Sequence, residues 1–184
     1  LWSTPAIIVY LIAATIGVSA MLIHWDAYVN TFMQFFNLQG AIAYALAITT
    51  VKVIHELSHA YTAKNYKVYV PTMGIAFIVL WPVLYTDVTS GWKLPQRKQR
   101  LAITIAGVAA ELVIAGLALL GWSLSSPGIW QSVFFLLSSV SLLGSLLINT
   151  NPAMRFDGYY LLADALDEPN LQARAFALGR WQLR

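Results

Sequence analysis

The chain has 184 residues, of which 59% are hydrophobic and only 10% are charged, and its formal net charge is +3 at pH 7. A soluble domain carries about a quarter charged residues, so this composition, with a mean hydropathy of +0.66, indicates an integral membrane protein. The chain contains no cysteine, which excludes disulfides, thiolate chemistry and cysteine-bound metals. Because the first residue is leucine, we expect the chain to be part of a longer protein.

Four apolar segments are long enough to cross about 30 Å of hydrocarbon as helices. Tryptophans fall near the segment ends, as is typical of residues at a membrane interface. The first segment lacks a basic leader and a cleavage site, so we predict a spanning helix there rather than a signal peptide. The predicted spans are residues 5–23, 41–63, 101–122 and 129–150.

The second span contains the pattern His55-Glu56-Leu57-Ser58-His59. Residues four apart on a helix share one face, so two imidazoles in this pattern can bind one small cation. Glu56 can then act as general base on an activated water. The alternative is a chance match, with both histidines satisfied by hydrogen bonds. Ionisable side chains at membrane depth are costly and usually functional, which favours a zinc site.

The segment after this span is harder to interpret. Residues 68–86 are rich in β-branched and aromatic side chains and are interrupted by Pro71, Gly74 and Pro82. They could form a fifth spanning helix, but basic residues flank them on both sides. We therefore predict strands or a re-entrant loop, which membrane depth tolerates only if protein or a wet cavity covers it.

The basic residues predict the orientation of the chain. Of eleven lysines and arginines, only Lys52 lies within a span, and the other ten lie in the 64–100 loop or after residue 150. The connections 24–40 and 123–128 contain none. By the positive-inside rule the basic side is cytoplasmic. The excess positive charge is therefore a topology signal, and we expect no nucleic-acid partner.

Two charged residues lie inside the predicted spans besides Glu56. Glu111 should face the protein interior, either as a partner that orients a ligating histidine or as a structural carboxyl paired with Lys52 or Arg155. Lys52 could stabilise an oxyanion, but pairing with Glu56 or another intramembrane acid is the simpler interpretation. The glycines of the third span are predicted to permit close helix packing; they are Gly107, Gly116 and Gly121.

A catalytic zinc needs three protein ligands and one open position. Without cysteine, and with His24 predicted on the far side, the third ligand must be a carboxylate. Asp157 is the best candidate, because the topology returns it to the side of His55 and His59. The preceding Asn151-Pro152 breaks the fourth span, and Gly158 permits an unusual backbone. The alternative is that Asp157-Gly158 is an ordinary turn.

The end of the chain differs from the rest in composition. Residues 167–184 begin with Glu168-Pro169 and then alternate apolar and basic side chains. They could form an amphipathic helix on the membrane surface or a solvated linker. We therefore divide the chain into a membrane-embedded core, residues 1–166, and an interfacial tail or linker, residues 167–184.

Two motifs together resemble those of a known family. His55-Glu56-x-x-His59 on one membrane helix, followed two helices later by Asn151-Pro152 and Asp157-Gly158, is similar to the site-2 protease family of intramembrane zinc metalloproteases. The resemblance covers residues 41–166 and looks closest to a bacterial branch described as peptide zinc metalloproteases, some associated with peptide export. It implies three zinc ligands, a general base at Glu56, and an Asn151 that positions the substrate or the helix break; the ligands would be His55, His59 and Asp157.

The chain departs from the family pattern in two places. Many members have a second proline where this chain has Met154, and many have Gly-Pro-x-x-Asn where this chain has Gly107-Val108-Ala109-Ala110-Glu111. Neither difference touches the expected zinc ligands. The role usually given to that asparagine is therefore open here.

The sequence thus predicts an all-α integral membrane protein with four transmembrane helices and a small strand or re-entrant element after the HExxH helix. The predicted function is hydrolysis of a peptide bond in a membrane-inserted or membrane-associated substrate by zinc-activated water. We expect a bacterial inner membrane location, an active site toward the cytoplasm, and export machinery as a partner of interest. Two alternatives remain open: a non-proteolytic component of a peptide export assembly, and a zinc hydrolase of a lipid or small molecule.

Overall fold

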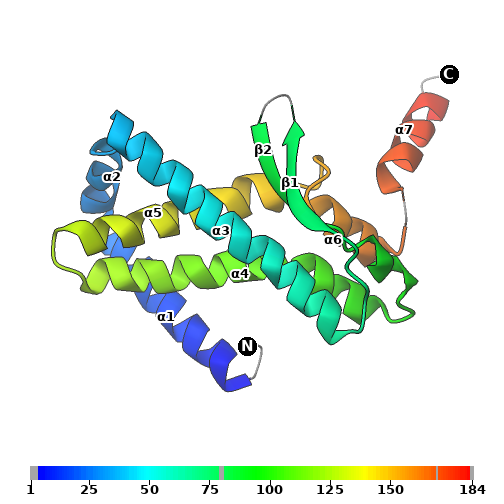
Figure 1. Cartoon of the computed structure of the whole chain (residues 1–184), viewed down its shortest axis with the longest axis horizontal. Coiled ribbons are helices and arrows are strands. Elements are labelled where there is room, and N and C mark those ends of the chain that lie inside the picture. The colour runs from blue at the N-terminus through cyan, green and yellow to red at the C-terminus, as the bar shows by residue number, and fades with distance from the viewer. Residues whose placement is uncertain (1–3, 79–80, 169, 183–184) are drawn as a thin grey trace.

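The computed structural model describes residues 4–78, 81–168 and 170–182, and within them the chain is mostly helical (Figure 1). Four helices are long and apolar enough to cross a membrane, which confirms the predicted fold class. The elements are α1 (Thr4–Ile23), α2 (Trp25–Met33), α3 (Leu38–Asn65), β1 (Met73–Ile78), β2 (Trp81–Thr86), the short 3-10 helix η1 (Thr89–Lys93), α4 (Arg97–Leu124), α5 (Ile129–Leu143), the π-helical η2 (Gly144–Asn149), α6 (Asp157–Leu166) and α7 (Leu171–Gln182).

The helix ends differ from the predicted spans in an understandable way. Helices α3 and α4 extend by two to four residues beyond each end of the predicted apolar segments. Polar residues can continue a helix at a bilayer surface, because their side chains stay in contact with water there. Asn37 caps α3, and its side-chain oxygen accepts from the N–H of Gly40 at 2.8 Å. Helix α2 was not predicted; it occupies part of the 24–40 connection.

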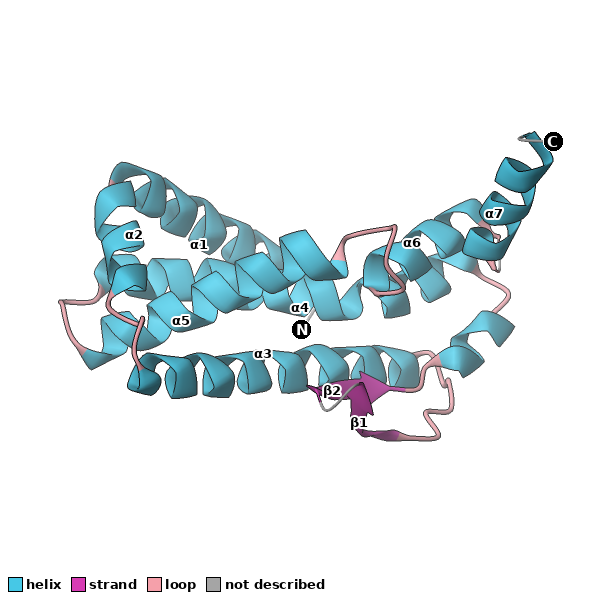
Figure 2. Ribbon diagram, turned by 90° about the horizontal axis from the view of Figure 1, so that it is seen from above, coloured by secondary structure: helices cyan, strands magenta, loops and turns pink. Residues whose placement is uncertain are grey.

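Residues 73–86 form an antiparallel hairpin, not a fifth spanning helix. Met73 pairs with Thr86 and Ile75 with Leu84, which confirms the strand prediction for this segment; residues 79–80 lie outside the described part of the chain. The hairpin lies alongside α3 (Figure 2), where the Thr86 hydroxyl donates to the backbone oxygen of Glu56 at 3.1 Å. Beyond β2, hydrogen bonds from Thr89 lower the pKa of the exposed Asp87 carboxyl and close the turn into η1.

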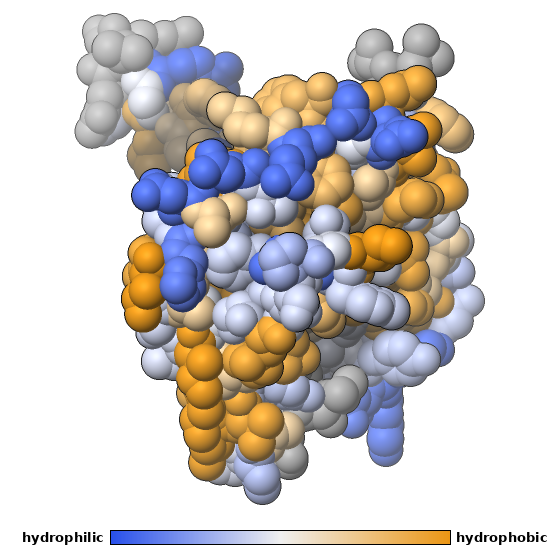
Figure 3. Space-filling view, turned by 90° about the vertical axis from the view of Figure 1, so that its left-hand side faces the viewer, coloured by the Kyte–Doolittle hydropathy of each residue, from blue (hydrophilic) through white to orange (hydrophobic). Residues whose placement is uncertain are grey.

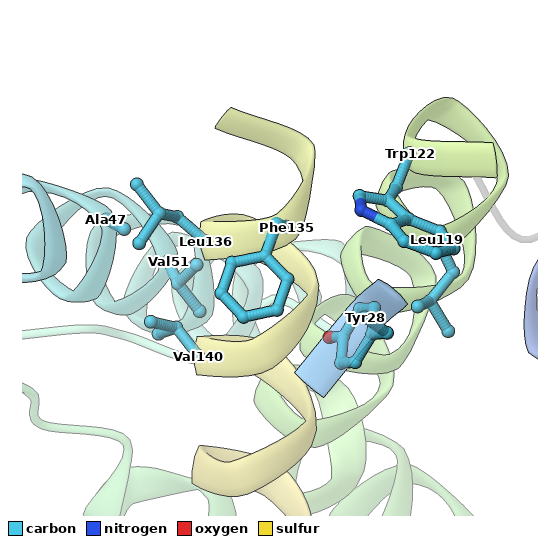
Figure 4. Close-up of a cluster of buried hydrophobic side chains, with 8 residues drawn as sticks. All are labelled: Tyr28, Ala47, Val51, Leu119, Trp122, Phe135, Leu136 and Val140. Atoms are coloured by element: carbon cyan, nitrogen blue, oxygen red, sulfur yellow. The ribbon is translucent and has the colours of Figure 1, made fainter. Parts of the chain in front are cut away.

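Helix α4 is the centre of the bundle and contacts α1, α3, α5 and α6. At one end of the bundle, which we call the aromatic end, eight buried side chains pack together (Figure 4). Tyr28 meets Trp122 edge-on with ring centroids 5.2 Å apart, and Phe135 stacks on Phe35 at 5.8 Å. The eight are Tyr28, Ala47, Val51, Leu119, Trp122, Phe135, Leu136 and Val140.

The outer surfaces of the helices are strongly apolar. Helix α1 exposes a row of aliphatic side chains, including Val9, Leu11 and Ile12, each more than half exposed. Seen from the end where α2 lies, hydrophobic residues cover much of the flanks and a band of hydrophilic residues crosses the end (Figure 3). This distribution suits a bundle whose sides face lipid and whose ends meet the interface.

Candidate metal centre

The two histidines of the HExxH motif lie one turn apart on α3, on the face turned toward α4. Both are nearly inaccessible, at 4% exposed for His55 and 6% for His59. Their Nε2 atoms are only 3.2 Å apart. The helical spacing expected from the sequence therefore places two ring nitrogens at one point.

Asp157 reaches the same point from the other end of the chain. The fourth span changes from α5 to the π-helical η2, ends at Asn149, and is followed by a turn in which Asn151 Oδ1 accepts from the N–H of Ala153 at 2.9 Å. Helix α6 then begins at Asp157. The break predicted at Asn151-Pro152 is thus what turns the chain back toward α3.

Gly158 serves this turn by its small size. We expected it to supply an unusual backbone, but it is helical, and the positive-φ glycine among the described residues is Gly128. A Cβ at position 158 would lie 2.4 Å from the carbonyl oxygen of Thr150. The glycine therefore lets the start of α6 lie directly against the end of the fourth span.

Three potential ligand atoms converge. The Oδ2 atom of Asp157 is 3.0 Å from Nε2 of His55 and 3.4 Å from Nε2 of His59. Tetrahedral zinc with bonds of about 2.0–2.1 Å holds its ligand atoms about 3.3 Å from one another. The separations of 3.0, 3.2 and 3.4 Å fit that arrangement.

The neighbours of the imidazoles leave a donor set at this meeting point that suits a cation. Nδ1 of His59 lies 2.8 Å from the backbone oxygen of Ile103, and Nδ1 of His55 lies 2.9 Å from Oε1 of Glu111. Both contacts are to acceptors, which places the proton of each neutral ring on Nδ1. Two Nε2 lone pairs and a carboxylate oxygen then face one another, and such a set of donors suits a metal ion placed between them.

Gly107 of α4 leaves the space in which these atoms meet. A Cβ at this position would lie 2.4 Å from Nε2 of His59 and 2.5 Å from Nε2 of His55. We expected this glycine to permit helix packing. It does bring α4 close to α3, and it does so at the ring nitrogens themselves.

The candidate centre opens on one side into a cavity of about 370 Å³. Glu56, half-buried, lines this cavity beside His59 and Asp157. Strand β2, the segment after it, α4 and α6 supply the rest of the wall: Leu84, Tyr85, Thr86, Val88, Thr89, Gly91, Trp92, Arg100, Ile103, Thr104, Tyr160 and Asp164.

Behind the histidines lies a buried polar cluster. Glu111 is fully buried and accepts from Lys52 at 2.7 Å, so Lys52 pairs with an acid of another helix rather than with Glu56. Two further donors to Glu111, Ser145 and Asn149, were not singled out in the sequence. The cost of placing polar side chains in a membrane span was a signal that could have found these two residues. Asn151 does not join this cluster.

The model of peptidase family M50 matches residues 43–151, which is 109 of the 184 residues. The chain belongs to peptidase family M50. This is the site-2 protease family, so the resemblance drawn from the motifs is confirmed, and the chain is a membrane protein of a metalloprotease family for which zinc is typical. The M50 match includes the HExxH motif and Glu111 and ends before Asp157. The chain has no significant match among curated proteins or among solved structures.

Proposed function

We propose that this chain is an intramembrane zinc metalloprotease that cleaves peptide bonds in membrane-inserted or membrane-associated substrates. The observation that carries the proposal is the convergence of His55, His59 and Asp157, with their ligand atoms within 4.8 Å of one another, beside Glu56 and an open cavity. Two imidazoles and one carboxylate are a donor set that suits catalytic zinc and leaves a fourth position open.

The residues divide the chemistry between them. His55, His59 and Asp157 would hold zinc, which when bound polarises a carbonyl and lowers the pKa of water. Glu56 accepts the proton of the attacking water and passes it to the amine that leaves as the peptide bond breaks. The Nδ1 contacts of the two histidines keep their Nε2 atoms turned toward the ligand position.

The cavity supports an extended substrate. A helical substrate must unwind locally before its carbonyl is open to attack, because the hydrogen bonds of the helix engage its carbonyl groups. Leu84, Tyr85 and Thr86 of β2 line the cavity, so we propose that an extended segment there pairs with the main chain of this strand.

The charge distribution supports a location for the site. Lys64 lies nine residues after His55, about 13 Å along a helix, and ten of the eleven basic residues share that side of the membrane. We place the site below the cytoplasmic surface of a bacterial inner membrane. Export machinery is the partner to look for, because the family branch that this chain resembles includes members associated with peptide export.

The test measures zinc and cleavage in the same preparations. Wild type, Glu56→Gln, His59→Ala and Asp157→Ala are purified in detergent, metal-loaded, and incubated with a model transmembrane peptide. We expect about one zinc per chain in wild type and in Glu56→Gln, loss of zinc in the other two, and a fall of about 10²–10⁴-fold in cleavage for Glu56→Gln.

A matched control is Glu168→Gln, which removes an acid outside the cavity and should leave both readouts unchanged. Substantial cleavage by Glu56→Gln would contradict the assigned base. Absence of zinc from supplemented wild type would contradict the protease proposal and favour a non-proteolytic component of an export assembly. Release of acyl products from lipid, without peptide cleavage, would point to a lipid hydrolase.

A further inference from the structure

Glu111 uses both of its carboxylate oxygens. Oε1 lies 2.7 Å from Nζ of Lys52 and 2.9 Å from Nδ1 of His55. Oε2 accepts from the Ser145 hydroxyl at 2.5 Å and from Nδ2 of Asn149 at 2.7 Å. The side chain is 0% exposed, so solvent does not reach these contacts.

These contacts join three segments of the bundle. Lys52 and His55 come from α3, Glu111 from the middle of α4, and Ser145 and Asn149 from η2. Asn149 also accepts from Lys52, with Oδ1 3.3 Å from Nζ. A carboxylate buried without a counter-ion would be strongly destabilising, and Lys52 supplies the opposite charge.

The π-helical form of η2 matters for this cluster. The N–H of Thr150 donates to the oxygen of Ser145 at 3.0 Å, a hydrogen bond five residues long. Ser145 and Asn149, four residues apart on this turn, face the same carboxylate, and π-helical turns inside α-helices are frequent at functional sites. Two residues after Asn149, the chain breaks at Asn151-Pro152 and leads to Asp157. One carboxylate thus contacts a candidate ligand on α3 and the segment that carries the third candidate ligand.

We infer that Glu111 is a positioning residue for the metal centre: it orients the His55 ring through Nδ1 and anchors η2, with Lys52 as its counter-ion. The inference rests on the proposed function and adds the part of the chain that fixes the ligand geometry. The Glu111–His55 contact is within hydrogen-bonding distance without being an aligned hydrogen bond. A small rotation of the imidazole would bring the N–H at Nδ1 into line with Oε1. Outer partners of this kind are worth about 10–100-fold in metal affinity.

The competing explanation is that Glu111 and Lys52 are only a structural ion pair. Three variants separate the two: Glu111→Gln, Lys52→Met and the double variant. Lys52→Met breaks the ion pair and keeps the carboxylate on His55, whereas Glu111→Gln removes the charge that faces His55. The double variant removes both charges, so it restores charge balance without restoring the carboxylate.

Cobalt and zinc affinities are measured by titration and competition, together with the visible spectrum of the cobalt form and thermal unfolding. We expect the double variant to recover most of the unfolding temperature lost in either single variant. Its metal affinity should stay about 10–100-fold below that of wild type, with an altered cobalt spectrum. Lys52→Met should bind metal more tightly than Glu111→Gln. The control Ser139→Ala, a buried hydroxyl of α5 outside the cluster, should leave the affinity and spectrum unchanged.

Wild-type affinity in the double variant would overturn the inference, as would wild-type affinity in a folded Glu111→Gln protein. Because the readout is metal binding, a wild-type protein that binds metal but cleaves no peptide would contradict the proposed function and leave the inference standing. A wild-type protein that binds neither metal would overturn both.

Discussion

The two ends of the bundle share helices α3 and α4 but have opposite chemistry. At the aromatic end, α3, α4 and α5 meet through Val51, Leu119 and Phe135, with Tyr28 of α2 among them (Figure 4). One turn further along α3, the buried side chains are those of His55 and His59. Helix α4 places Gly107 and Glu111 beside them. The change falls between Val51 and His55.

The difference separates rigidity from chemistry. Apolar packing at the aromatic end needs no partners in a fixed direction, so it stabilises the helices' mutual position through many weak contacts. At the other end, which holds the candidate metal centre with His55, His59 and Glu111 and which we call the metal end, each polar atom needs a specific partner, and a misplaced one is costly. Packing at the aromatic end therefore fixes the position of α3 against α4, while the polar contacts at the metal end keep the candidate ligand atoms close together.

The largest expected effect comes from adding one methyl group to α4 beside the histidines and, for comparison, one at the aromatic end. Gly107→Ala places a Cβ 2.4–2.5 Å from the imidazoles, whereas Gly121→Ala places one 2.8 Å from the ring of Phe134. We expect Gly107→Ala to lose zinc under conditions where wild type holds about one per chain. Gly121→Ala should cost about 1–3 kcal/mol in stability and keep its zinc.

Zinc content and unfolding in detergent check both variants. Equal zinc loss in the two would show that any crowding along α4 disturbs the site. That result would contradict the division between the ends.

Phe135→Ala is expected to change stability but not zinc binding, so its effect on the site is smaller than that of Gly107→Ala. It removes the largest fully buried side chain of the aromatic end. Truncation of a buried phenylalanine costs about 3–5 kcal/mol in soluble proteins. The lower end of that range is expected here, because helices in lipid gain from packing and not from transfer out of water. Denaturation measures this loss.

At temperatures where the variant is folded, its zinc affinity should equal that of wild type. Valine at position 140 provides the matched control, since Val140→Ala removes less volume nearby and should cost less. A folded Phe135→Ala protein without zinc would contradict the prediction.

The smallest effect sharpens the comparison, because it concerns a polar contact at the aromatic end. The hydroxyls of Tyr28 and Ser138 lie 2.9 Å apart and both are buried. Ser138→Ala should cost about 1 kcal/mol, typical of a polar contact between membrane helices. Tyr28→Phe should cost a similar amount, and the double variant little more than either.

Unfolding midpoints of the two single variants and the double variant test this. Additive losses would show that the two hydroxyls do not interact. A loss of zinc in either single variant would show that polar contacts at the two ends are coupled.

Much of the molecule follows from simple sequence rules. The four spans follow from apolar length, and the HExxH spacing places His55 and His59 on one face. Basic residues on both sides of residues 68–86 correctly argued against a crossing, and the hairpin replaces it. Charge and spacing therefore predict both the topology and the side of the molecule on which Asp157 arrives.

Other features depend on contacts between distant segments. Nothing local distinguishes Ser145 from Ser138 or Ser139, although only Ser145 donates to Glu111. The π-helical turn of η2 lies where Ser145 and Asn149 donate to that carboxylate, and no periodicity in the sequence predicts the turn. Gly107 looked like any packing glycine, because its neighbours are 48 and 52 positions earlier in the chain.

The pairing of Lys52 with Glu111 also bears on how the chain enters the membrane during synthesis. Helix α3 has the lowest mean hydropathy of the four candidate spans, and it carries Lys52 and Glu56 as charged groups. A charged residue near the centre of an inserting helix costs about 2.5–3.5 kcal/mol. The partner that offsets Lys52 is made 59 residues later. Helix α3 is therefore expected to stay beside the translocon until α4 emerges, so that the two helices enter lipid as a pair.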